Sequence, residues 1–539
     1  MTLSPCPKNF NFGWDVVADL GRAAQVATIF VPEEGSPRRI TFAQVHDRSS
    51  RVARLYRSLG LEAGDRVVMV LPRIPAFYEV IVGGIKAGVV SMPGTNLLTA
   101  RDLKYRVQQT GARAAVVTAG HAEAIDAILD DCPTLEHRVL VGGTREGWTN
   151  YEEAVDASSY LTREEAPSTV ATDPMLLYFT SGTTSHPKAV VRDHAYAWAH
   201  RLTGQHWMDL REGDVHWTLT DTGWAKAAWG LLFPQWSLGA TTVLYESARF
   251  EPERCLQLIG ELGVSTFCAP PTVYRMFAQM DLSTYDLSSL RRSLAAGEPL
   301  NPEVIAVWKK ATGAAPADGY GQTETVNLVG NTPGLPVRPG SMGKPIPGLD
   351  VDIVDEEGAV CPPDEVGQIA VRVPDLLPSE APLETWPPGL FRGYEQDGRT
   401  LTDSFRNGWY YTGDTAWKDK DGYIWFVGRS DDVITSGAYR ISPFEVESVL
   451  QEHPAVAESA VVAKPDPIRG HIVVAVVVAA RDATPSASLG RELQDFCREQ
   501  TAPYKYPREV HFMDELPKTI SGKIRRVELR ETLAEVDPR

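Results

Sequence analysis

The sequence predicts an α/β protein with a large N-terminal domain and a small C-terminal α+β domain; the large domain has mainly parallel sheets, helical crossovers and a β-rich subdomain. Three observations predict this class. Strand-like and helix-like segments alternate from Arg39 to Gly321. From about Val351 the pattern changes to short hairpin-like segments with Asp and Gly turns, and another α/β unit follows Asp432. The length of 539 residues allows two or more domains with substantial cores.

The N-terminal elements follow from the spacing of apolar residues. Residues 39–60 begin with a short extended piece and continue with a helical pattern that ends at Gly60. Residues 65–72 predict a strand, 76–88 a helix and 89–94 a second strand, and 102–120 repeat the helix–strand pattern. Similar units recur at 251–271 and 302–321. Such alternation favours parallel strands that are joined by helical crossovers.

The C-terminal part has a different texture. Residues 351–375 and 422–432 predict hairpins, and 374–390 form a proline-rich loop. Further elements are expected at 442–463, at the valine-rich strand 471–480 and at a helix around Leu493. Polar, turn-prone residues interrupt the apolar pattern at 430–432, so the predicted domains are residues 1–430 and 431–539.

Composition excludes several classes of protein. The net charge of −17 disfavours nonspecific nucleic-acid binding, because phosphate backbones need basic surfaces. The most apolar run, 471–480, is too short to span a membrane. The six cysteines include no CxxC pair, and the N-terminus shows no signal-peptide pattern. We therefore expect reduced thiols and a cytoplasmic location.

The stretch from Leu176 to His194 carries the first chemical signal. An apolar, strand-like segment runs into five hydroxylated residues and one glycine, and then Pro187 and Lys188 follow. A loop with many donors and one cation suits a polyphosphate, and an ordinary polar turn is the alternative. The stretch is not the nucleotide-binding loop of kinases and GTPases, which needs Gly-Lys followed by Ser or Thr.

Three later segments have both a functional and a structural interpretation. In residues 318–325, Glu324 offers an oxygen ligand of the kind Mg²⁺ accepts, although the octamer also suits a surface turn. Asp414 follows a glycine and suits the vicinal hydroxyls of a ribose, with Arg429 in support. Either residue also fits an ordinary turn or surface position. Lys523 follows Ser-Gly in residues 516–526, which suits a mobile amine or a solvated charged face.

Taken together, these segments resemble the adenylate-forming superfamily, which includes acyl-CoA synthetases, nonribosomal peptide adenylation domains and firefly-type luciferases. The motifs agree in order and spacing over nearly the whole chain, and they are YFTSGTTSHPK, YGQTE, YYTGD, GRSDDVITSGAYRISPFEVE and PKTISGKIRR. The segments TDTGWAKAAWGLLFPQW and PDPIRG are most similar to the medium-chain acyl-CoA synthetase branch. The resemblance implies an ATP-dependent ligase that forms an acyl-adenylate and then a CoA thioester, with ATP, Mg²⁺ and CoA as small-molecule partners.

The resemblance also assigns roles to residues that bind ATP. The phosphates would contact Thr180, Ser181, Gly182, Thr183, Thr184 and Lys188. The adenine slot would consist of Gly297, Glu298, Pro299, Asp318, Gly319 and Tyr320. Asp414 and Arg429 would bind the ribose. Thr323 would contact the α-phosphate, and Glu324 would position Mg²⁺.

The remaining roles involve the acyl group and the C-terminal domain. Lys523 would bridge the substrate carboxylate and the α-phosphate, with Arg440 assisting. Asp431 matches a hinge about which the C-terminal domain moves between the two half-reactions. CoA would meet Gly437, Ala438, Tyr439 and Arg469, and Trp224 would wall the acyl pocket.

Two departures from the family pattern stand out. Ser185 occupies a position where the phosphate loop usually has glycine, so we expect a less mobile loop. Lys226 lies two residues after Trp224, where it either points away from the pocket or pairs with a carboxylate, because a buried unpaired ammonium is costly.

Because the resemblance places the bulky Trp224 at the wall of the acyl pocket, we expect a short- to medium-chain, branched or aromatic acid as the substrate. A ligase that loads a carrier protein, a luciferase-like oxygenase and a non-catalytic nucleotide-binding protein are the alternatives.

Overall fold

The computed structural model describes residues 4–180, 187–297, 302–429, 432–436, 439–466, 469–501, 505–518 and 524–536. These residues form two compact units. The first contains 4–180, 187–351 and 372–403, and the second contains 352–371 and 404–536 with the gaps just given. The predicted boundary between residues 430 and 431 lies within the second unit, at residues outside those described, and stays a prediction.

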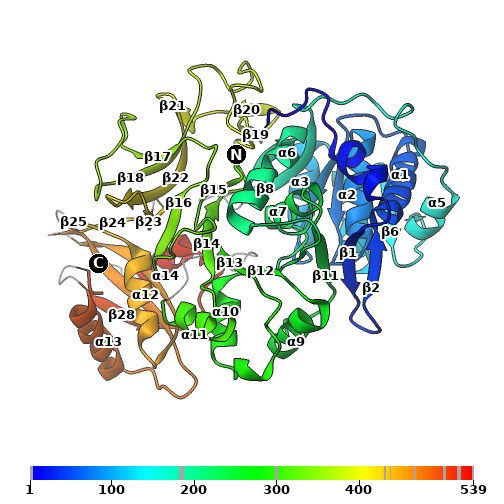
Figure 1. The fold of residues 1–539 in the computed structure, drawn as a ribbon. Helices are drawn as coiled ribbons and strands as arrows, with labels where there is room; N and C mark the ends of the chain where they lie inside the picture. The colour runs from blue at the N-terminus through cyan, green and yellow to red at the C-terminus, as the bar shows by residue number, and fades with distance from the viewer. Residues whose placement is uncertain are drawn as a thin grey trace. The chain divides into compact units, whose positions relative to one another are not determined.

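One sheet of the first unit confirms the predicted strand–helix alternation (Figure 1). The strand order is β20-β19-β9-β8-β4-β3-β5-β6-β7. The strands are β3 (Arg66–Val70), β4 (Val90–Pro93), β5 (Ala114–Thr118), β6 (His137–Val141), β7 (Thr149–Asn150), β8 (Pro174–Thr180), β9 (Lys188–Asp193), β19 (Tyr394–Gln396) and β20 (Arg399–Leu401). Strands β3 to β8 are parallel, whereas β9, β19 and β20 continue the sheet in antiparallel pairs.

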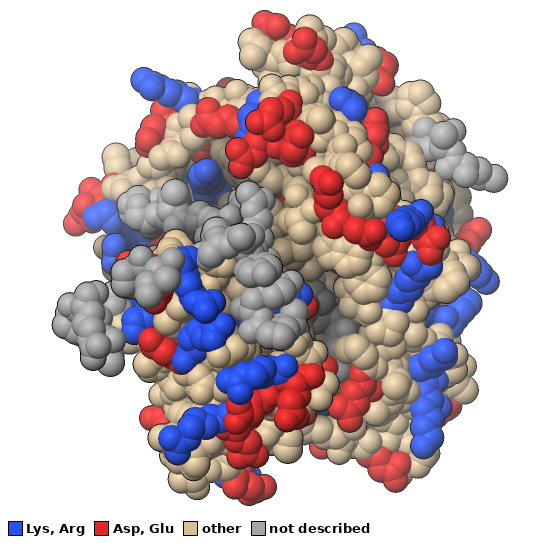
Figure 2. All heavy atoms as spheres, turned by 90° about the vertical axis from the view of Figure 1, so that its left-hand side faces the viewer, with Lys and Arg blue, Asp and Glu red and all other residues tan. Residues whose placement is uncertain are grey.

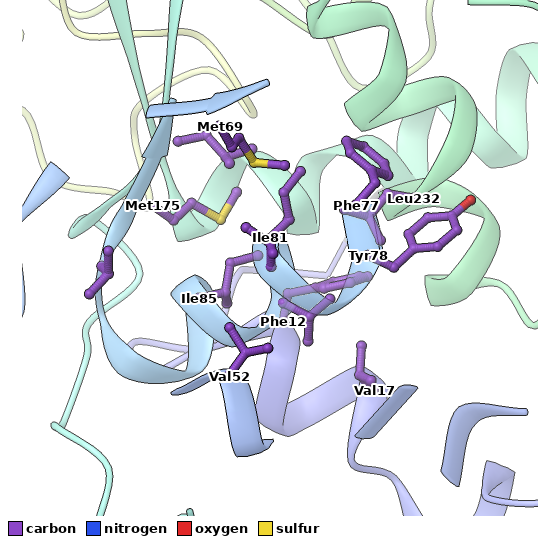
Figure 3. Close-up of a cluster of buried hydrophobic side chains, with 14 of the residues drawn as sticks. Phe12, Val17, Val52, Met69, Phe77, Tyr78, Ile81, Ile85, Met175 and Leu232 are labelled. Carbon is purple, nitrogen blue, oxygen red and sulfur yellow. The ribbon is translucent and has the colours of Figure 1, made fainter. Parts of the chain in front are cut away.

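Helices cover both faces of this sheet. They are α1 (Phe42–Ser58), α2 (Ala76–Ala87), α3 (Ala100–Thr110) and α4 (Ala119–Asp126). Along β3, Val67 and Met69 pack in one core with α1 and α2, and Val68 and Val70 pack in another with α3 and α4. Burial on both faces explains why this strand reads as a continuous apolar run. Figure 3 shows the first core, where Met69, Phe77, Tyr78 and Met175 point into one cluster.

The second sheet of the first unit has the order β16-β15-β14-β13-β12-β10-β11-β1-β2. Its strands are β1 (Val26–Val31), β2 (Arg38–Thr41), β10 (Val215–Thr218), β11 (Thr241–Tyr245), β12 (Thr266–Ala269), β13 (Arg292–Ala296), β14 (Ala317–Gly321), β15 (Asn327–Gly330) and β16 (Ser341–Pro345). Strands β1, β11, β10, β12, β13 and β14 are parallel. Helices α9 (Pro252–Leu262), α10 (Pro271–Ala278) and α11 (Pro302–Thr312) pack against this sheet (Figure 1).

Shorter helices of the same unit complete its core. They are α5 (Tyr151–Ala157), α6 (His194–Leu202), α7 (Ala225–Leu231) and α8 (Phe233–Ser237). Helices α6, α7 and α8 contribute Tyr196, Ala228 and Trp236 to the core that also contains α1 and α2.

The second unit contains the predicted hairpin of residues 351–375 and the C-terminal α+β module. Strands β17 (Val351–Val354), β18 (Val366–Arg372), β22 (Trp409–Lys418) and β23 (Ile424–Arg429) are neighbours in that order, and β21 (Phe405–Arg406) pairs with β22. Residues 422–432, for which the sequence also predicts a hairpin, instead contribute one strand, β23, which pairs with the preceding strand β22. Strand β24 (Ile434–Ser436) pairs with β25 (Tyr439–Ile441). A further sheet has the order β26 (Val456–Asp466), β27 (Gly470–Ala479) and β28 (Glu509–Phe512), and β27 is the predicted valine-rich strand.

Three helices cover that last sheet, α12 (Pro443–Glu452), α13 (Ala487–Gln500) and α14 (Arg526–Val536). Val446 of α12 and Leu493 of α13 share one core, and Leu529 of α14 lies in another with the alternate residues of β26 and β27. The helix expected around Leu493 is therefore confirmed.

Surface charge is mixed where the residues are described. On the face drawn in Figure 2, Lys and Arg side chains lie in small groups interspersed with Asp and Glu. Within the described ranges, no helix combines the length and the apolar composition that crossing a membrane requires.

Candidate active site

The predicted phosphate loop begins and ends at paired strand positions. Thr180 ends β8 and Lys188 begins β9, and the two residues are antiparallel partners. The Thr180 hydroxyl donates a hydrogen bond to the Lys188 carbonyl at 3.4 Å. The predicted phosphate ligands Ser181, Gly182, Thr183 and Thr184, together with Ser185, lie outside the described residues. The hairpin nevertheless brings both ends of the loop to one point.

Lys188 and Glu324 are 136 positions apart in the sequence, but their side chains contact the same tyrosine. The Lys188 Nζ atom lies 4.8 Å from the centroid of the Tyr394 ring. The Tyr394 hydroxyl donates to Glu324 Oε1 at 2.8 Å, and Glu324 is buried at 8% exposure. The structure therefore brings Lys188, the cation predicted to bind the phosphates, close to Glu324, the predicted Mg²⁺ ligand.

The main chain at Glu324 is held by β9 and by the segment before β19. Arg192 Nη1 and the Phe391 amide each donate to the Glu324 carbonyl at 2.8 Å. Arg192 also donates to the Gly389 carbonyl and lies over the Tyr196 ring at 3.9 Å. These contacts fix the turn that carries Glu324 and the half-buried Thr323.

The chemistry of this group fits a magnesium ion that is bound together with substrate phosphates. Within the described ranges, no three His, Cys, Asp or Glu side chains gather as a metal cluster. Mg²⁺ commonly uses one or two carboxylates, with waters and phosphate oxygens as its other ligands. A single buried carboxylate beside the predicted phosphate loop is such an arrangement.

The predicted adenine slot lies at the carboxyl ends of two parallel strands. Ala296, the last residue of β13, is the register partner of Gly319 on β14, so Gly297 follows β13 at the edge of the sheet near which Tyr320 of β14 lies. Ligands of open α/β sheets bind at this edge. Gly297 has a φ of 118°, which favours glycine. Glu298 and Pro299 lie outside the described residues.

The buried side chain of Trp207 contacts Asp318 and Gly319. This residue is not identified from the sequence alone. The Trp207 indole nitrogen donates to the Asp318 carbonyl at 3.1 Å, and the ring is fully buried. A Cβ atom on Gly319 would lie 2.3 Å from the indole ring. Burial raises the pKa of the Asp318 carboxyl to about 8, although a hydrogen bond from the Gly319 amide opposes this shift.

The predicted acyl-pocket residue Trp224 precedes α7 and is half-buried. Next to it, Gly223 packs so closely on the backbone of Gly94 and Thr95 that an added Cβ would lie 2.1 Å from it. Lys226 donates to the Ala296 carbonyl at 3.3 Å, and its Nζ lies 5.6 Å from the Trp229 ring centroid. Burial lowers the pKa of Lys226. Among the described residues, Lys226 has no carboxylate partner. Its hydrogen bond to Ala296 instead places the ammonium group next to Gly297, at the edge of the predicted adenine slot.

The predicted ribose ligands meet within the second unit. Asp414 on β22 and Arg429 on β23 are directly opposite partners in the antiparallel pair. Asp414 is buried at 7% exposure, whereas Arg429 is exposed. The hairpin thus places a carboxylate and a guanidinium opposite each other, and their binding of a ribose stays a prediction.

The predicted residues of the C-terminal module fall mostly outside the described ranges. Asp431, Gly437, Ala438 and Lys523 lie outside the described residues, as do the side chains of Tyr439 and Arg440. Lys518 and Ile524 form a β-bridge on either side of the Lys523 segment. Arg469 is exposed in the turn between β26 and β27, and its amide donates to Asp466 Oδ1 at 2.7 Å.

Comparison with known families gives two matches. Residues 19–379 match the family described as AMP-binding enzyme, and residues 445–523 match the AMP-binding enzyme C-terminal domain. The two matches share the order of the predicted domains.

Curated relatives match over nearly the full chain. Mitochondrial acyl-coenzyme A synthetase ACSM3 of Mus musculus is 41% identical over 97% of this chain and 91% of its own length. Mitochondrial acyl-coenzyme A synthetase ACSM5 of Mus musculus is 43% identical over 98% and 91%.

Solved structures share the fold. The anthranilate CoA ligase AuaEII in complex with anthranoyl-AMP superposes with a TM-score of 0.89 at 31% identity, covering 100% of both chains. A benzoate CoA ligase from Burkholderia xenovorans LB400 has a TM-score of 0.80 at 27% identity, over 97% of this chain and 100% of its own.

Proposed function

The chain belongs to the AMP-binding enzyme family, in the medium-chain acyl-CoA synthetase branch, and is an AMP-forming acyl-CoA ligase; from this premise we propose that its substrates are short- to medium-chain, branched or aromatic carboxylic acids. The observation that supports adenylation is that Lys188 and Glu324 both contact Tyr394 next to the predicted phosphate loop. Support for an aromatic acid comes from the likeness to the anthranilate and benzoate CoA ligases.

The reaction has two steps whose atoms balance. A carboxylate oxygen of the acid attacks the α-phosphorus of ATP, and the bond to pyrophosphate breaks, which gives acyl-AMP. The sulfur of CoA then attacks the acyl carbonyl carbon, the thiol proton is lost and AMP leaves. The first step brings an anion up to a polyanion, so cations and oriented amides are needed to offset their repulsion.

Several residues of both units are proposed to bind the nucleotide. Lys188 and the loop Thr180–Thr184 would hold the outer phosphates, and Thr323 would contact the α-phosphate. Glu324 would hold Mg²⁺, which supplies charge neutralisation on the phosphates when it is bound. The adenine would lie at the edge formed by Gly297 and Tyr320. Asp414 and Arg429 would bind the ribose.

The C-terminal module is proposed to serve both steps by moving about Asp431. Lys523 would neutralise the approaching anions in the first step, with Arg440 assisting on the phosphates. In the second step Lys523 would withdraw, and Gly437, Ala438, Tyr439 and Arg469 would border CoA. Gly437 suits a narrow channel, because a side chain there would narrow it further.

Trp224 is proposed to limit the size of the acid. Its bulky ring before α7 would shorten the acyl pocket and exclude long chains. A Trp224→Gly variant should therefore accept longer or wider acids than the wild-type chain does. An unchanged chain-length profile would contradict this role.

The decisive experiment is a panel of carboxylic acids assayed for pyrophosphate release, with and without CoA. We expect acid-dependent pyrophosphate release and stoichiometric consumption of CoA for at least one short, branched or aromatic acid. Adenylation without use of free CoA would favour a ligase that loads a carrier protein. Absence of acid-dependent pyrophosphate release across the panel would favour a non-catalytic nucleotide-binding protein.

The location is also a proposal. The cytoplasm is proposed because we expect reduced thiols in this chain, whereas the curated relatives named above are mitochondrial. Fractionation of native cells with an antibody against the full chain tests this, and recovery in an organelle would overturn it.

A further inference from the structure

Tyr394 contacts both of the charged groups that the proposed adenylation step needs from the first unit. Its hydroxyl donates to Glu324 Oε1 at 2.8 Å, and its ring lies 4.8 Å from Lys188 Nζ. A tyrosine can make both contacts at once, because the hydroxyl is a donor in the ring plane and the ring face attracts a cation. No motif in the sequence marks this residue.

The position of Tyr394 is set by its strand. On β19, Tyr394 is the register partner of Val190 on β9, two residues beyond Lys188. The next residue, Glu395, forms a bidentate ion pair with Arg66, with distances of 2.6 and 2.8 Å. The Phe391 ring packs edge-on against the Tyr394 ring at 4.8 Å. The ring therefore sits on a short strand that is tied down on both sides.

The Glu324 side chain gains a fixed orientation from this hydroxyl. Its backbone carbonyl is already fixed by Arg192 and the Phe391 amide, and the hydrogen bond from Tyr394 restrains the rotation of the carboxylate. Partners that orient a metal-binding carboxylate commonly change metal affinity by 10–100-fold when they are removed.

We propose that Tyr394 is a positioning residue that orients Glu324 toward Mg²⁺ and ties this orientation to Lys188 at the base of the phosphate loop. This inference rests on the proposed function. Through Glu324, Tyr394 would affect how the rate of adenylation depends on Mg²⁺ concentration. Its ring would stabilise the Lys188 ammonium group through the cation–π contact.

The test separates the hydroxyl from the ring. Tyr394→Phe removes the hydrogen bond but keeps the ring under Lys188, and Tyr394→Leu removes both. Tyr151→Phe is the matched control, because Tyr151 is a buried tyrosine that donates to a different glutamate, Glu79, at 2.6 Å. Calorimetry measures ATP affinity with Mg²⁺ and with EDTA, and pyrophosphate release is measured against Mg²⁺ concentration.

We expect Tyr394→Phe to raise the half-saturating Mg²⁺ concentration about tenfold and to leave the affinity for metal-free ATP within about twofold of wild type. Tyr394→Leu should also weaken metal-free ATP binding, because it removes the support of Lys188. Tyr151→Phe should change neither. In a Glu324→Gln background, Tyr394→Phe should have no further effect on the metal response.

Two results would overturn the inference. One is a Mg²⁺ response of Tyr394→Phe equal to that of wild type, and the other is a full additional effect in the Glu324→Gln background. The calorimetric readout needs no acid substrate. A calorimetric shift in a chain that releases no pyrophosphate with any acid would therefore defeat the proposed function and leave the role of Tyr394 toward metal-bound ATP standing.

Discussion

Gly319 shows how one residue without a side chain shapes the predicted adenine slot. Its Cα lies against the buried Trp207 indole, and that indole also carries the hydrogen bond to the Asp318 carbonyl. A methyl group there would push β14 away from Trp207, and with it the edge that Tyr320 occupies. Packing at this residue thus links a buried tryptophan to a site residue.

A Gly319→Ala substitution tests this link. Overpacking of a tight site costs about 1–3 kcal/mol, so the variant should be less stable by that amount and should bind ATP more weakly. Gly120→Ala is the matched control, because nothing lies within 4 Å of a Cβ at Gly120. Urea unfolding and ATP calorimetry measure both variants. Equal ATP affinity in Gly319→Ala and wild type would disprove the link.

Lys523 is the residue on which the proposed two-step chemistry depends most. Lys523→Ala should lower the formation of acyl-AMP by about 100-fold, the scale of losing one group that stabilises transition-state charge. Conversion of pre-made acyl-AMP to thioester should stay near the wild-type rate. Lys518→Ala, which removes an ion pair with Glu458 at 2.7 Å, is the control in the same segment. Full activation of the free acid by Lys523→Ala would refute the assignment.

At the scale of elements, the C-terminal module is held by a buried ion pair between two helices. Glu447 of α12 is 4% exposed and accepts from Arg526 Nη2 of α14 at 2.7 and 2.8 Å. It also accepts from the Val461 amide at 2.7 Å. Arg526 and Arg530 both lie near Asp432 as well, at 3.7 and 3.1 Å. Helix α14 is thereby tied to the first residue described after the predicted hinge.

Neutralising Glu447 should lower the free energy of unfolding of the C-terminal module. Glu447→Gln leaves Arg526 without its buried counter-charge, which costs about 3 kcal/mol. Glu445→Gln lies on the same helix and removes a more exposed pair with Lys505, so it should cost less than about 1 kcal/mol. Thermal unfolding followed by circular dichroism compares the two. Similar transitions for both variants would argue against a stabilising role of the buried pair.

At the scale of the whole molecule, fully buried histidines contribute to how the free energy of unfolding responds to acid. Burial lowers the pKa of His194 to about 4 and that of His216 to about 3, and it holds that of His200 well below 6.5. The unfolded chain therefore takes up protons below pH 6.5 that the folded chain refuses. Asp318, whose pKa burial raises to about 8, acts in the opposite direction, because its folded form keeps a proton that the unfolded form releases.

The unfolding free energy should accordingly fall as the pH drops from 6.5 toward 4. Each refused proton contributes a slope of about 1.4 kcal/mol per pH unit. His216→Gln, which keeps a donor and an acceptor between Thr218 and Thr266, should reduce the slope by about one proton. Urea unfolding at several pH values measures the slope. A flat or rising unfolding free energy over this range would be inconsistent with buried neutral histidines.

Local pattern was sufficient for the fold class and for the family. The alternation of strands and helices, the valine-rich β27, and the motifs around Lys188, Glu324 and Asp414 are all read within short windows, because periodicity and turn chemistry are local properties. They predicted the class of reaction that the relatives support, and they gave the residues that we propose take part in it.

Contacts between distant segments required the folded chain. No motif in the sequence identified Tyr394, Arg192 or Trp207 as residues of the site. Their roles depend on the pairing of β19 with β9, on the hydrogen bond from Arg192 to Glu324, and on the packing of β14 against the Trp207 indole. The opposition of Asp414 to Arg429 likewise depends on the register of β22 and β23. Strand register and side-chain packing are set by interactions among residues far apart along the chain, so no window of sequence contains them.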